Sequence, residues 1–161
     1  MVGGEGAYRE IPDIWKNKVI YIPENGFDPN RFAPTQNLSR QPFENRPIKA
    51  IYLGRLVPYK GCDMLIEAAA DLIKQNKLRL TIIGSGPEED TIKSLIQEQG
   101  ITAGINFTGE LRHKQVADHI AGADILTFPS VHEFGGAVVL EAMAMGVVPV
   151  VVLDDAKDAL P

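Results

Sequence analysis

The sequence predicts a doubly wound α/β domain in which helices cover both faces of a parallel sheet. Apolar runs of strand length recur from residue 48 onward, and segments with helical spacing of Ala, Leu and Ile separate them. The runs are apolar throughout instead of alternating with polar residues, which is typical of strands buried on both faces. A chain of 161 residues is long enough for one such domain with its own core.

The expected elements follow in order along the chain. Strands are predicted at 48–54, 78–84, 105–109, 124–130 and 147–152, and helices at 62–76, 87–100, 114–123 and 136–145. The second helix has the clearest boundary signals, with Pro87 near its start, acids in its first turn and Gly100 past its end. Strands that alternate with helices in this way predict parallel pairing through helical crossovers.

Residues 1–47 differ from the rest, and we expect them to form a strand and a turn-rich linker that pack on the domain of residues 48–161. The run at 18–22 is apolar enough for a short strand, and Asn25-Gly26 is a strong turn signal. At the other end, the chain stops at Pro161, shortly after a core strand. We therefore expect it to be part of a larger protein.

Composition limits the functions that the chain can have. The net charge of −5 argues against general affinity for nucleic acid or acidic membranes. The first residues given lack the basic and apolar regions of a signal peptide, and no apolar run approaches the roughly 20 residues that span a bilayer. Cys62 is the only cysteine, which excludes an intrachain disulfide and favours a reducing, cytoplasmic compartment. No metal-ligand spacing is present, so we expect neither a metal nor a cofactor.

Ligands of doubly wound sheets bind at the carboxyl ends of the strands, and two loops there carry suggestive residues. The loop GRLVPYKG (54–61) holds Arg55 and Lys60, which can both reach one diphosphate, although two solvated surface cations are the alternative. In the loop GSGPEED (84–90), the glycines at 84 and 86 favour a tight turn that lets backbone approach a flat group. We therefore expect both loops to line a ligand pocket.

The same glycine loop could also suggest a dinucleotide-binding fingerprint. Glu89 stands where the third glycine of that fingerprint belongs, and Gly104 replaces the acid expected about 20 residues on. An NAD-dependent oxidoreductase is therefore disfavoured.

The segment EFGGAVVLE (133–141) places Glu133 and Glu141 on either side of glycine and apolar residues. Glu141 sits on no polar face of the predicted helix, because its neighbours at three and four positions are Ala137, Val138, Ala144 and Met145. An unpaired buried carboxylate is costly, so it should have a partner. That partner is either a backbone group or a ligand.

The start of this helix suits an anion, because Gly135 and Gly136 precede a turn of free N–H groups. If the whole segment were helical, the two carboxylates would lie about 12 Å apart. That separation is too long for an acid/base pair acting at one atom. It suits two acceptors that hold opposite ends of an extended polyhydroxylated ligand.

These motifs together resemble the C-terminal, nucleotide-sugar-binding half of a retaining GT-B glycosyltransferase of family four, a Rossmann-like domain. The resemblance covers nearly the whole chain from Val19 onward. In order, its motifs are IPENGFDPNRFAP, GRLVPYKG, IIGSGPEEDTIKSLI, INFTGELRHKQVADHIAGADILTFPS and EFGGAVVLEAMAMGVVPVVV. The order Phe134-Gly135 departs from the family, which usually has Gly followed by Phe.

The resemblance implies a role for each candidate residue. Arg55 and Lys60 would bind the donor diphosphate, Glu133 the sugar hydroxyls and Glu141 the ribose, with the first three as the catalytic groups. Backbone N–H groups would hold the distal phosphate or sugar, and two further loops would contact the base. The residues implied for these backbone and base contacts are Phe134, Gly135, Gly136 and Ala137, and then Gly84, Gly86, Glu110 and Leu111.

The resemblance also implies the partners of the chain. The donor would be a nucleotide-diphosphate sugar of UDP or GDP type, used without a metal, and the acceptor would be a sugar or lipid bound by an N-terminal domain. The chain alone would bind donor without turnover, and its full-length parent could lie at the cytoplasmic face of a membrane. The alternatives are a nucleotide-sugar epimerase of similar build and a non-catalytic nucleotide-binding module.

Overall fold

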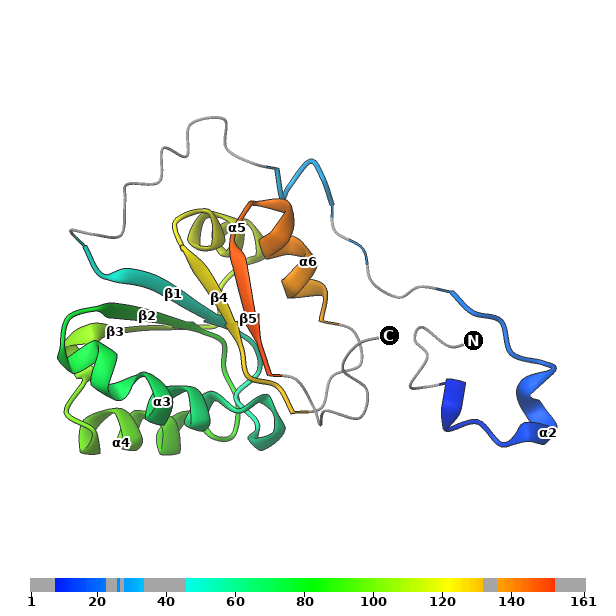
Figure 1. Cartoon of the computed structure of the whole chain (residues 1–161), viewed down its shortest axis with the longest axis horizontal. Helices are drawn as coiled ribbons and strands as arrows, with labels where there is room; N and C mark the ends of the chain where they lie inside the picture. The colour runs from blue at the N-terminus through cyan, green and yellow to red at the C-terminus, as the bar shows by residue number, and fades with distance from the viewer. Residues whose placement is uncertain (1–7, 23–25, 27, 34–45, 132–135, 153–161) are drawn as a thin grey trace.

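The computed structural model describes residues 8–22, 26, 28–33, 46–131 and 136–152 (Figure 1). Its strands are β1 (Ile48–Leu53), β2 (Leu78–Ile83), β3 (Ile105–Gly109), β4 (Ile125–Phe128) and β5 (Val148–Val151). Its helices are α2 (Asp13–Lys16), α3 (Cys62–Lys74), α4 (Glu89–Glu98), α5 (His113–Ala121) and α6 (Ala137–Ala144), with short 3-10 helices η2 (Pro58–Lys60) and η3 (Thr102–Gly104).

The five strands form one parallel sheet in the order β3-β2-β1-β4-β5. The chain runs outward from β1 through β2 to β3 and then returns to the other side of β1 as β4. The strand order therefore reverses between β1 and β4, which is the topological switch point at which doubly wound sheets commonly bind ligands. The predicted doubly wound parallel sheet is confirmed.

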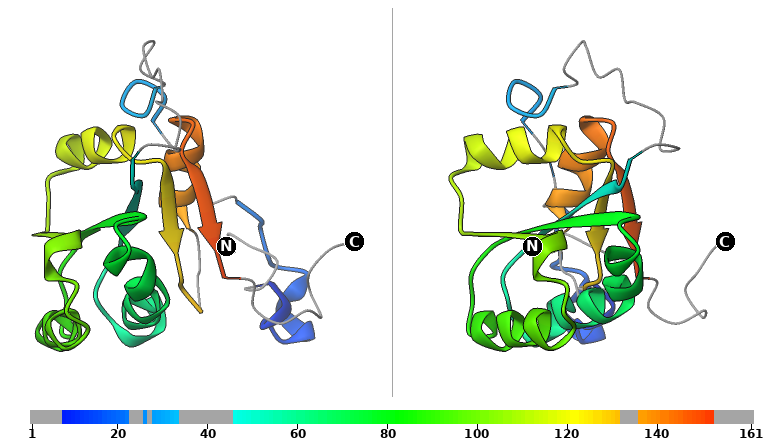
Figure 2. Two further views of the ribbon diagram at one scale, coloured as in Figure 1. Left: turned by 60° about the vertical axis from the view of Figure 1, so that its left-hand side comes forward. Right: turned by 90° about the vertical axis from the view of Figure 1, so that its left-hand side faces the viewer.

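Helices cover both faces of the sheet, as Figure 2 shows from two sides. On one face, α3 and α4 pack against β1 and β2 through a core that includes Tyr52, Ile66, Ile82 and Ile92. On the other face, α5 and α6 enclose a second core that includes Ile51, Ile83, Ile120, Leu126 and Met145. Cys62, at the start of α3, is buried in the first core, as expected for a packing residue.

The boundary signals of the second predicted helix hold in the structure. α4 begins at Glu89, two residues after Pro87, and has Glu89 and Asp90 in its first turn. Gly100 follows its end with φ +67°, a left-handed conformation that favours glycine. The predicted strand at 124–130 is shorter, because β4 ends at Phe128 and Pro129 begins the loop.

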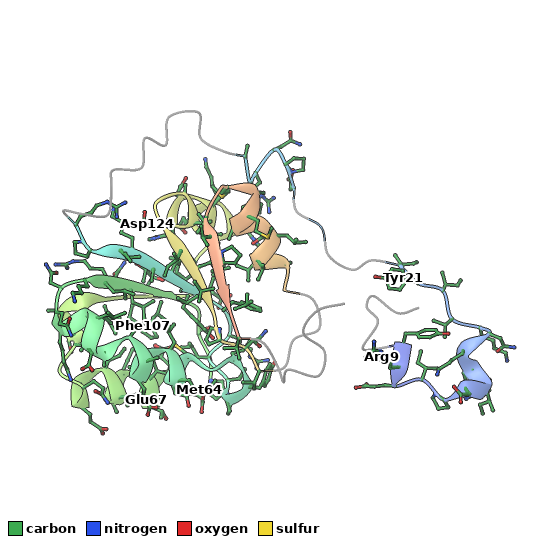
Figure 3. The ribbon with its side chains drawn as sticks, viewed as in Figure 1. Arg9, Tyr21, Met64, Glu67, Phe107 and Asp124 are labelled. Carbon is green, nitrogen blue, oxygen red and sulfur yellow. The ribbon has the colours of Figure 1, made fainter. Side chains whose placement is uncertain are left out.

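The strand predicted at 18–22 is wrong. This segment contains a single isolated bridge at Tyr21, and its apolar side chains are solvent-exposed. It lies to one side of the sheet, where Figure 3 labels Tyr21. An apolar run becomes a strand when a neighbouring strand accepts its hydrogen bonds, and no strand of the described sheet runs beside this segment.

A turn at residues 28–33 contacts the second core. The Asp28 carboxylate accepts a hydrogen bond from the Asn30 N–H at 2.9 Å, and the Asp28 carbonyl accepts from the N–H groups of Arg31 and Phe32. Phe32 is 3% exposed and packs with residues of α5 and α6. Figure 1 and Figure 2 both show this turn beside α6. The division of the chain at residue 47 remains a prediction.

A buried carboxylate ties the amino-terminal ends of three strands together. Asp124 is 4% exposed and accepts two hydrogen bonds from Arg46, at 2.6 and 2.9 Å, and one from the Lys49 N–H at 2.8 Å. Its own N–H donates to the Lys49 carbonyl, and its carbonyl accepts from Val148. β1, β4 and β5 are thereby fixed relative to one another at this end of the sheet.

Candidate functional site

The loops after β1 and β4 are held against each other at the point where the strand order reverses. Val131 N–H donates to the Tyr59 carbonyl at 2.9 Å, and the Ser130 hydroxyl donates to the same carbonyl at 3.4 Å. Gly61 adopts φ +64°, and a Cβ there would lie 2.5 Å from the Pro129 carbonyl oxygen. The close approach of the two loops therefore requires glycine at 61.

Lys60 lies at this junction, as the last residue of η2. Its Nζ is 5.6 Å from the ring centroid of Phe128, the last residue of β4, and 5.6 Å from the ring centroid of Tyr59. Aromatic faces attract a cation at such distances. The ammonium is thus placed at the carboxyl end of β4.

A cavity of about 500 Å³ opens on the other side of β1. Its volume lies within the range of about 300–1,000 Å³ that is usual for small-molecule sites. Five of the residues expected to bind the ligand line it: Arg55, Gly84, Gly86, Glu110 and Leu111. Leu53, Ile83 and Val116 supply its apolar surface. The charged groups at its wall are therefore one guanidinium and one carboxylate.

The glycine wall of this cavity is built by backbone packing against backbone. A Cβ at Gly84, whose φ is +144°, would lie 1.9 Å from the Gly54 carbonyl oxygen, and one at Gly86 would lie 2.2 Å from the Leu56 carbonyl oxygen. Hydrogen bonds from Gly84 N–H to Gly109 and from Leu56 N–H to Ser85, both 2.9 Å, join the three loops. A larger residue at 84 or 86 would clash with the neighbouring loop, so glycine is needed at both positions whether or not a ligand also approaches them.

The two charged residues of the cavity are positioned differently. The buried Tyr52 donates its hydroxyl hydrogen to the Arg55 carbonyl at 3.2 Å and fixes the backbone of that residue. In the described part of the chain, the Arg55 guanidinium forms no hydrogen bond or ion pair, so it is available to an anion. The Glu110 carboxylate accepts a hydrogen bond from the Ser85 hydroxyl at 3.3 Å.

α6 follows the loop after β4 and carries Glu141. Gly136 precedes the helix in the left-handed conformation, with φ +57°. Glu141 is half-buried, and burial raises the pKa of its carboxyl above the usual value, whereas the positive charges of His113 and Arg31 act to lower that pKa. Among the described residues, no hydrogen bond or ion pair reaches this carboxylate. It is an acceptor without a described partner, and its predicted role toward a ligand remains a prediction.

The predicted residues that the structure describes therefore fall into three parts of the site. The cavity gathers five of them, Lys60 lies at the junction of two loops, and Gly136, Ala137 and Glu141 belong to the start and middle of α6. Glu133, Phe134 and Gly135 lie outside the described residues. The sequence analysis missed the contributions of Tyr52, Arg31 and His113.

One missed residue carried a usable signal. A tyrosine hydroxyl in an otherwise apolar strand needs a hydrogen-bond partner, which pointed to a role for Tyr52. Arg31 and His113 carried none, because their proximity to Glu141 arises only when three separate elements pack together.

Two absences among the described residues bear on the class of site. No three His, Cys, Asp or Glu side chains there lie close enough to hold a metal ion, and the expected absence of a metal remains a prediction. None of the helices there is long and apolar enough to cross a membrane.

Many doubly wound α/β domains bind phosphorylated ligands at the topological switch point of the sheet, where the N-terminus of a helix can hold an anion. Comparison with known proteins identifies the family. The profile described as "Glycosyl transferases group 1" matches residues 35–156. The chain belongs to this family of glycosyltransferases and has the α/β architecture of their GT-B fold.

Two curated relatives illustrate the family. Alpha-D-kanosaminyltransferase of Streptomyces kanamyceticus is 33% identical over 139 residues, which make up 84% of this chain and 36% of that protein. A GDP-mannose-dependent alpha-(1-6)-phosphatidylinositol monomannoside mannosyltransferase of Mycolicibacterium smegmatis is 34% identical over 139 residues, or 78% of this chain and 36% of that protein. The chain spans about a third of the length of these relatives.

Two solved structures share the fold. Sucrose-phosphate synthase of Thermosynechococcus elongatus superposes with a TM-score of 0.73 and 26% identity, over 96% of this chain and 40% of that one. An Anabaena protein, HepE, solved in complex with UDP and glucose, gives a TM-score of 0.69 and 23% identity over 84% of this chain and 38% of that one.

Proposed function

We propose that this chain is the donor-binding half of a retaining glycosyltransferase, which holds a nucleotide-diphosphate sugar at the switch point of its sheet. The observation that carries the proposal is the position of Arg55, Lys60 and the start of α6 at the carboxyl ends of β1 and β4, in a chain that belongs to a glycosyltransferase family. Arg55 and Lys60 lie in the loop after β1, and α6 begins after the loop that follows β4. These three are cationic groups or free N–H donors, which suit a diphosphate.

The base and the ribose take the two regions beside the phosphates. The base enters the cavity between the glycine wall and the apolar side chains Leu111 and Val116. Glu141 accepts hydrogen bonds from the ribose, which supplies the partner that its carboxylate lacks among the described residues. Glu133 and the N–H groups of residues 134–137 hold the sugar and the distal phosphate.

The chemical role of this half is to stabilise the leaving group. When the glycosidic bond to the diphosphate breaks, negative charge grows on the leaving oxygen. Arg55, Lys60 and the N-terminus of α6 offset that charge without a metal ion. Loss of one such group lowers the rate about 10²-fold to 10³-fold, by analogy with the loss of an oxyanion-hole donor.

The acceptor, a sugar or a lipid, binds to a second, N-terminal domain. The relatives are about three times as long as the matched segment, which supports such a division of labour. The isolated chain then binds donor but does not transfer it. We place this enzyme in the cytoplasm, where nucleotide sugars are made.

The test is calorimetric titration of the chain with UDP, GDP, ADP and their sugar conjugates. The relatives and the fold neighbours include proteins named for GDP-mannose and solved with UDP, so both bases belong in the panel. We expect one nucleotide family to bind. Arg55→Ala should weaken that binding about 10-fold to 100-fold, because a hydrogen bond to a charged group contributes about 1.5–3 kcal/mol.

Matched controls separate the site from general charge effects. Arg79→Ala removes an exposed arginine of β2 whose guanidinium contacts Ala103 and Asn76, outside the cavity, and should leave binding unchanged. Equal losses in the Arg55 and Arg79 variants would contradict the proposed phosphate site. If no nucleotide binds at millimolar concentration to the chain or to a full-length parent, the transferase function is wrong.

A further inference from the structure

We propose that Glu110 selects the base of the donor nucleotide, and that the base it selects is guanine. The inference rests on the proposed function in taking the cavity beside β1 to be the base site. It adds the identity of the base and the side chain that decides it, both of which family membership leaves open.

Two loops hold the Glu110 carboxylate at the wall of this cavity. Ser85 lies in the loop after β2, Glu110 directly follows β3, and both residues line the cavity. The Ser85 hydroxyl donates a hydrogen bond to Oε2 of Glu110 at 3.3 Å. The backbone of the two loops is also joined, by a hydrogen bond of 2.9 Å from Gly84 N–H to the Gly109 carbonyl. The carboxylate is therefore placed at the cavity by its neighbours before any ligand arrives.

This carboxylate keeps most of its capacity to accept hydrogen bonds. An ionised carboxylate offers about four lone-pair sites on its two oxygens. Among the described residues, the Ser85 hydroxyl uses one site on Oε2 and no donor reaches Oε1. Arg55, the other charged residue of the cavity, forms no ion pair with Glu110 in that part of the chain. Both oxygens can therefore accept hydrogen bonds from a ligand in the cavity.

The common bases differ in what they offer such a carboxylate. Guanine carries two donors side by side, N1–H and the N2 amino group, and one carboxylate can accept from both. Uracil carries a single ring N–H between two carbonyl oxygens. Adenine and cytosine carry an amino group beside a ring nitrogen that is itself an acceptor. Each of these three bases therefore brings an acceptor against one of the carboxylate oxygens, which costs affinity.

No other side chain of the described cavity competes for the edge of the base. The lining has two charged residues, and the proposed function assigns Arg55 to the diphosphate. The other side chains of the lining are apolar, except for that of Ser85, whose hydroxyl is already bonded to Glu110. Glu110 is therefore the side chain of this lining that can distinguish one base from another.

Calorimetric titration of the wild-type chain with GDP, inosine diphosphate, UDP and ADP tests the inference without any substitution. Inosine diphosphate lacks only the N2 amino group of GDP, so it removes one of the two proposed hydrogen bonds. GDP should bind about 10-fold to 100-fold more tightly than inosine diphosphate, the factor that corresponds to one hydrogen bond to a charged group. UDP and ADP should bind more weakly than GDP by at least the same factor.

Glu110→Gln keeps the shape of the side chain and replaces one acceptor oxygen by an amino group. It should weaken GDP binding about 10-fold to 100-fold and bring the affinities for GDP and inosine diphosphate within about 3-fold of each other. Glu98→Gln is the matched control, because it removes the same charge from the exposed end of α4, outside the cavity. It should leave all four affinities unchanged. A Glu110 that acted only as a surface charge would behave differently, since its removal would strengthen the binding of all four diphosphates equally.

The outcomes separate this inference from the proposed function. Equal affinities for GDP and inosine diphosphate, or tighter binding of UDP or ADP than of GDP, overturn the assignment of guanine and leave the proposed function intact. An equal change for all four nucleotides in Glu110→Gln overturns the role of Glu110. If neither the chain nor a full-length parent binds any nucleotide, the proposed function fails and the inference fails with it.

Discussion

The two ends of the sheet differ in how many hydrogen bonds they give to a carboxylate. At the amino-terminal end, Asp124 is 4% exposed and receives hydrogen bonds from Arg46 and from the Lys49 N–H. Near the carboxyl-terminal end, Glu141 is half-buried and receives none from the described residues. A satisfied buried polar group stabilises a fold, whereas an unsatisfied one carries a cost that a ligand can offset. The difference separates the structural end of the domain from the end where we propose that the donor binds, the functional end.

The largest expected effect comes from the glycine wall of the cavity, which belongs to the functional end but is built from backbone. Gly84→Ala should lower the free energy of unfolding by about 3 kcal/mol or more, because the added Cβ meets the Gly54 carbonyl and the backbone must leave its conformation. Urea denaturation followed by circular dichroism measures the change.

Gly100→Ala is the control for this variant. Gly100 also has a left-handed φ of +67°, but a Cβ there meets nothing within 4 Å. It should cost about 1–2 kcal/mol, the conformational penalty alone. Similar losses at the two glycines would show that the carbonyl contact contributes little.

The next effect tests the structural end. Asp124→Ala should lower the free energy of unfolding by about 1–3 kcal/mol, because the partly buried hydrogen bonds from the Lys49 N–H and from Arg46 lose their acceptor. In a chain of this size, each kcal/mol corresponds to about 2–4 °C in Tm. Asp13→Ala breaks an ion pair with Lys16 in which the carboxylate is 90% exposed, and it should leave Tm unchanged. Equal losses of Tm in both variants would show that the buried Asp124 stabilises the fold no more than an exposed ion pair does.

Substitution of Glu141 should have the opposite effect on stability from substitution of Asp124. Its folded pKa is raised, so its contribution to stability is present at low pH and is lost as pH rises through that pKa. At neutral pH the ionised carboxylate therefore opposes folding. At pH 7, Glu141→Gln should raise the free energy of unfolding, and Tm should rise with it. The gain should be less than about 1 kcal/mol, because the group is half exposed. A lower Tm would mean that Glu141 is a structural carboxylate like Asp124.

The smallest effect concerns a residue with no role at either end. Burial, with smaller contributions from Asp63 and Glu88, raises the pKa of the Cys62 thiol to about 12. At pH 8, alkylation by iodoacetamide should be on the order of 10³-fold slower in the folded chain than in urea, because the thiolate is the reactive form. Rates within tenfold of each other would show that α3 opens readily at its start.

Much of the fold was predictable from the sequence, because the physical signals are local. Apolar runs identified all five strands of the described sheet, and Pro87 and Gly100 bounded α4. The strand predicted at 18–22 was wrong because apolar composition does not supply a neighbouring strand to pair with. The loops of the site were predictable for a topological reason, since the carboxyl ends of parallel strands meet at one edge.

The contacts that separate the two ends of the sheet were not predictable. Arg46 and Asp124 are 78 positions apart, and nothing in either segment points to the other. The same holds for Arg31, His113 and Glu141, which lie on three elements. The reason for Gly84 was also hidden, because the sequence suggested room for a ligand and the structure shows the Gly54 carbonyl in that position.

The outer strand of the described sheet bears on solubility. β5 exposes Val148, Val150 and Val151, and an apolar edge strand normally invites another chain to pair with it. The N–H groups of Val148 and Val152 point toward β4, so by alternation position 149 faces outward. That position is proline, which has no N–H to donate to an added strand. The edge is therefore less able to pair with an added strand, which should limit aggregation when this domain is kept at high concentration.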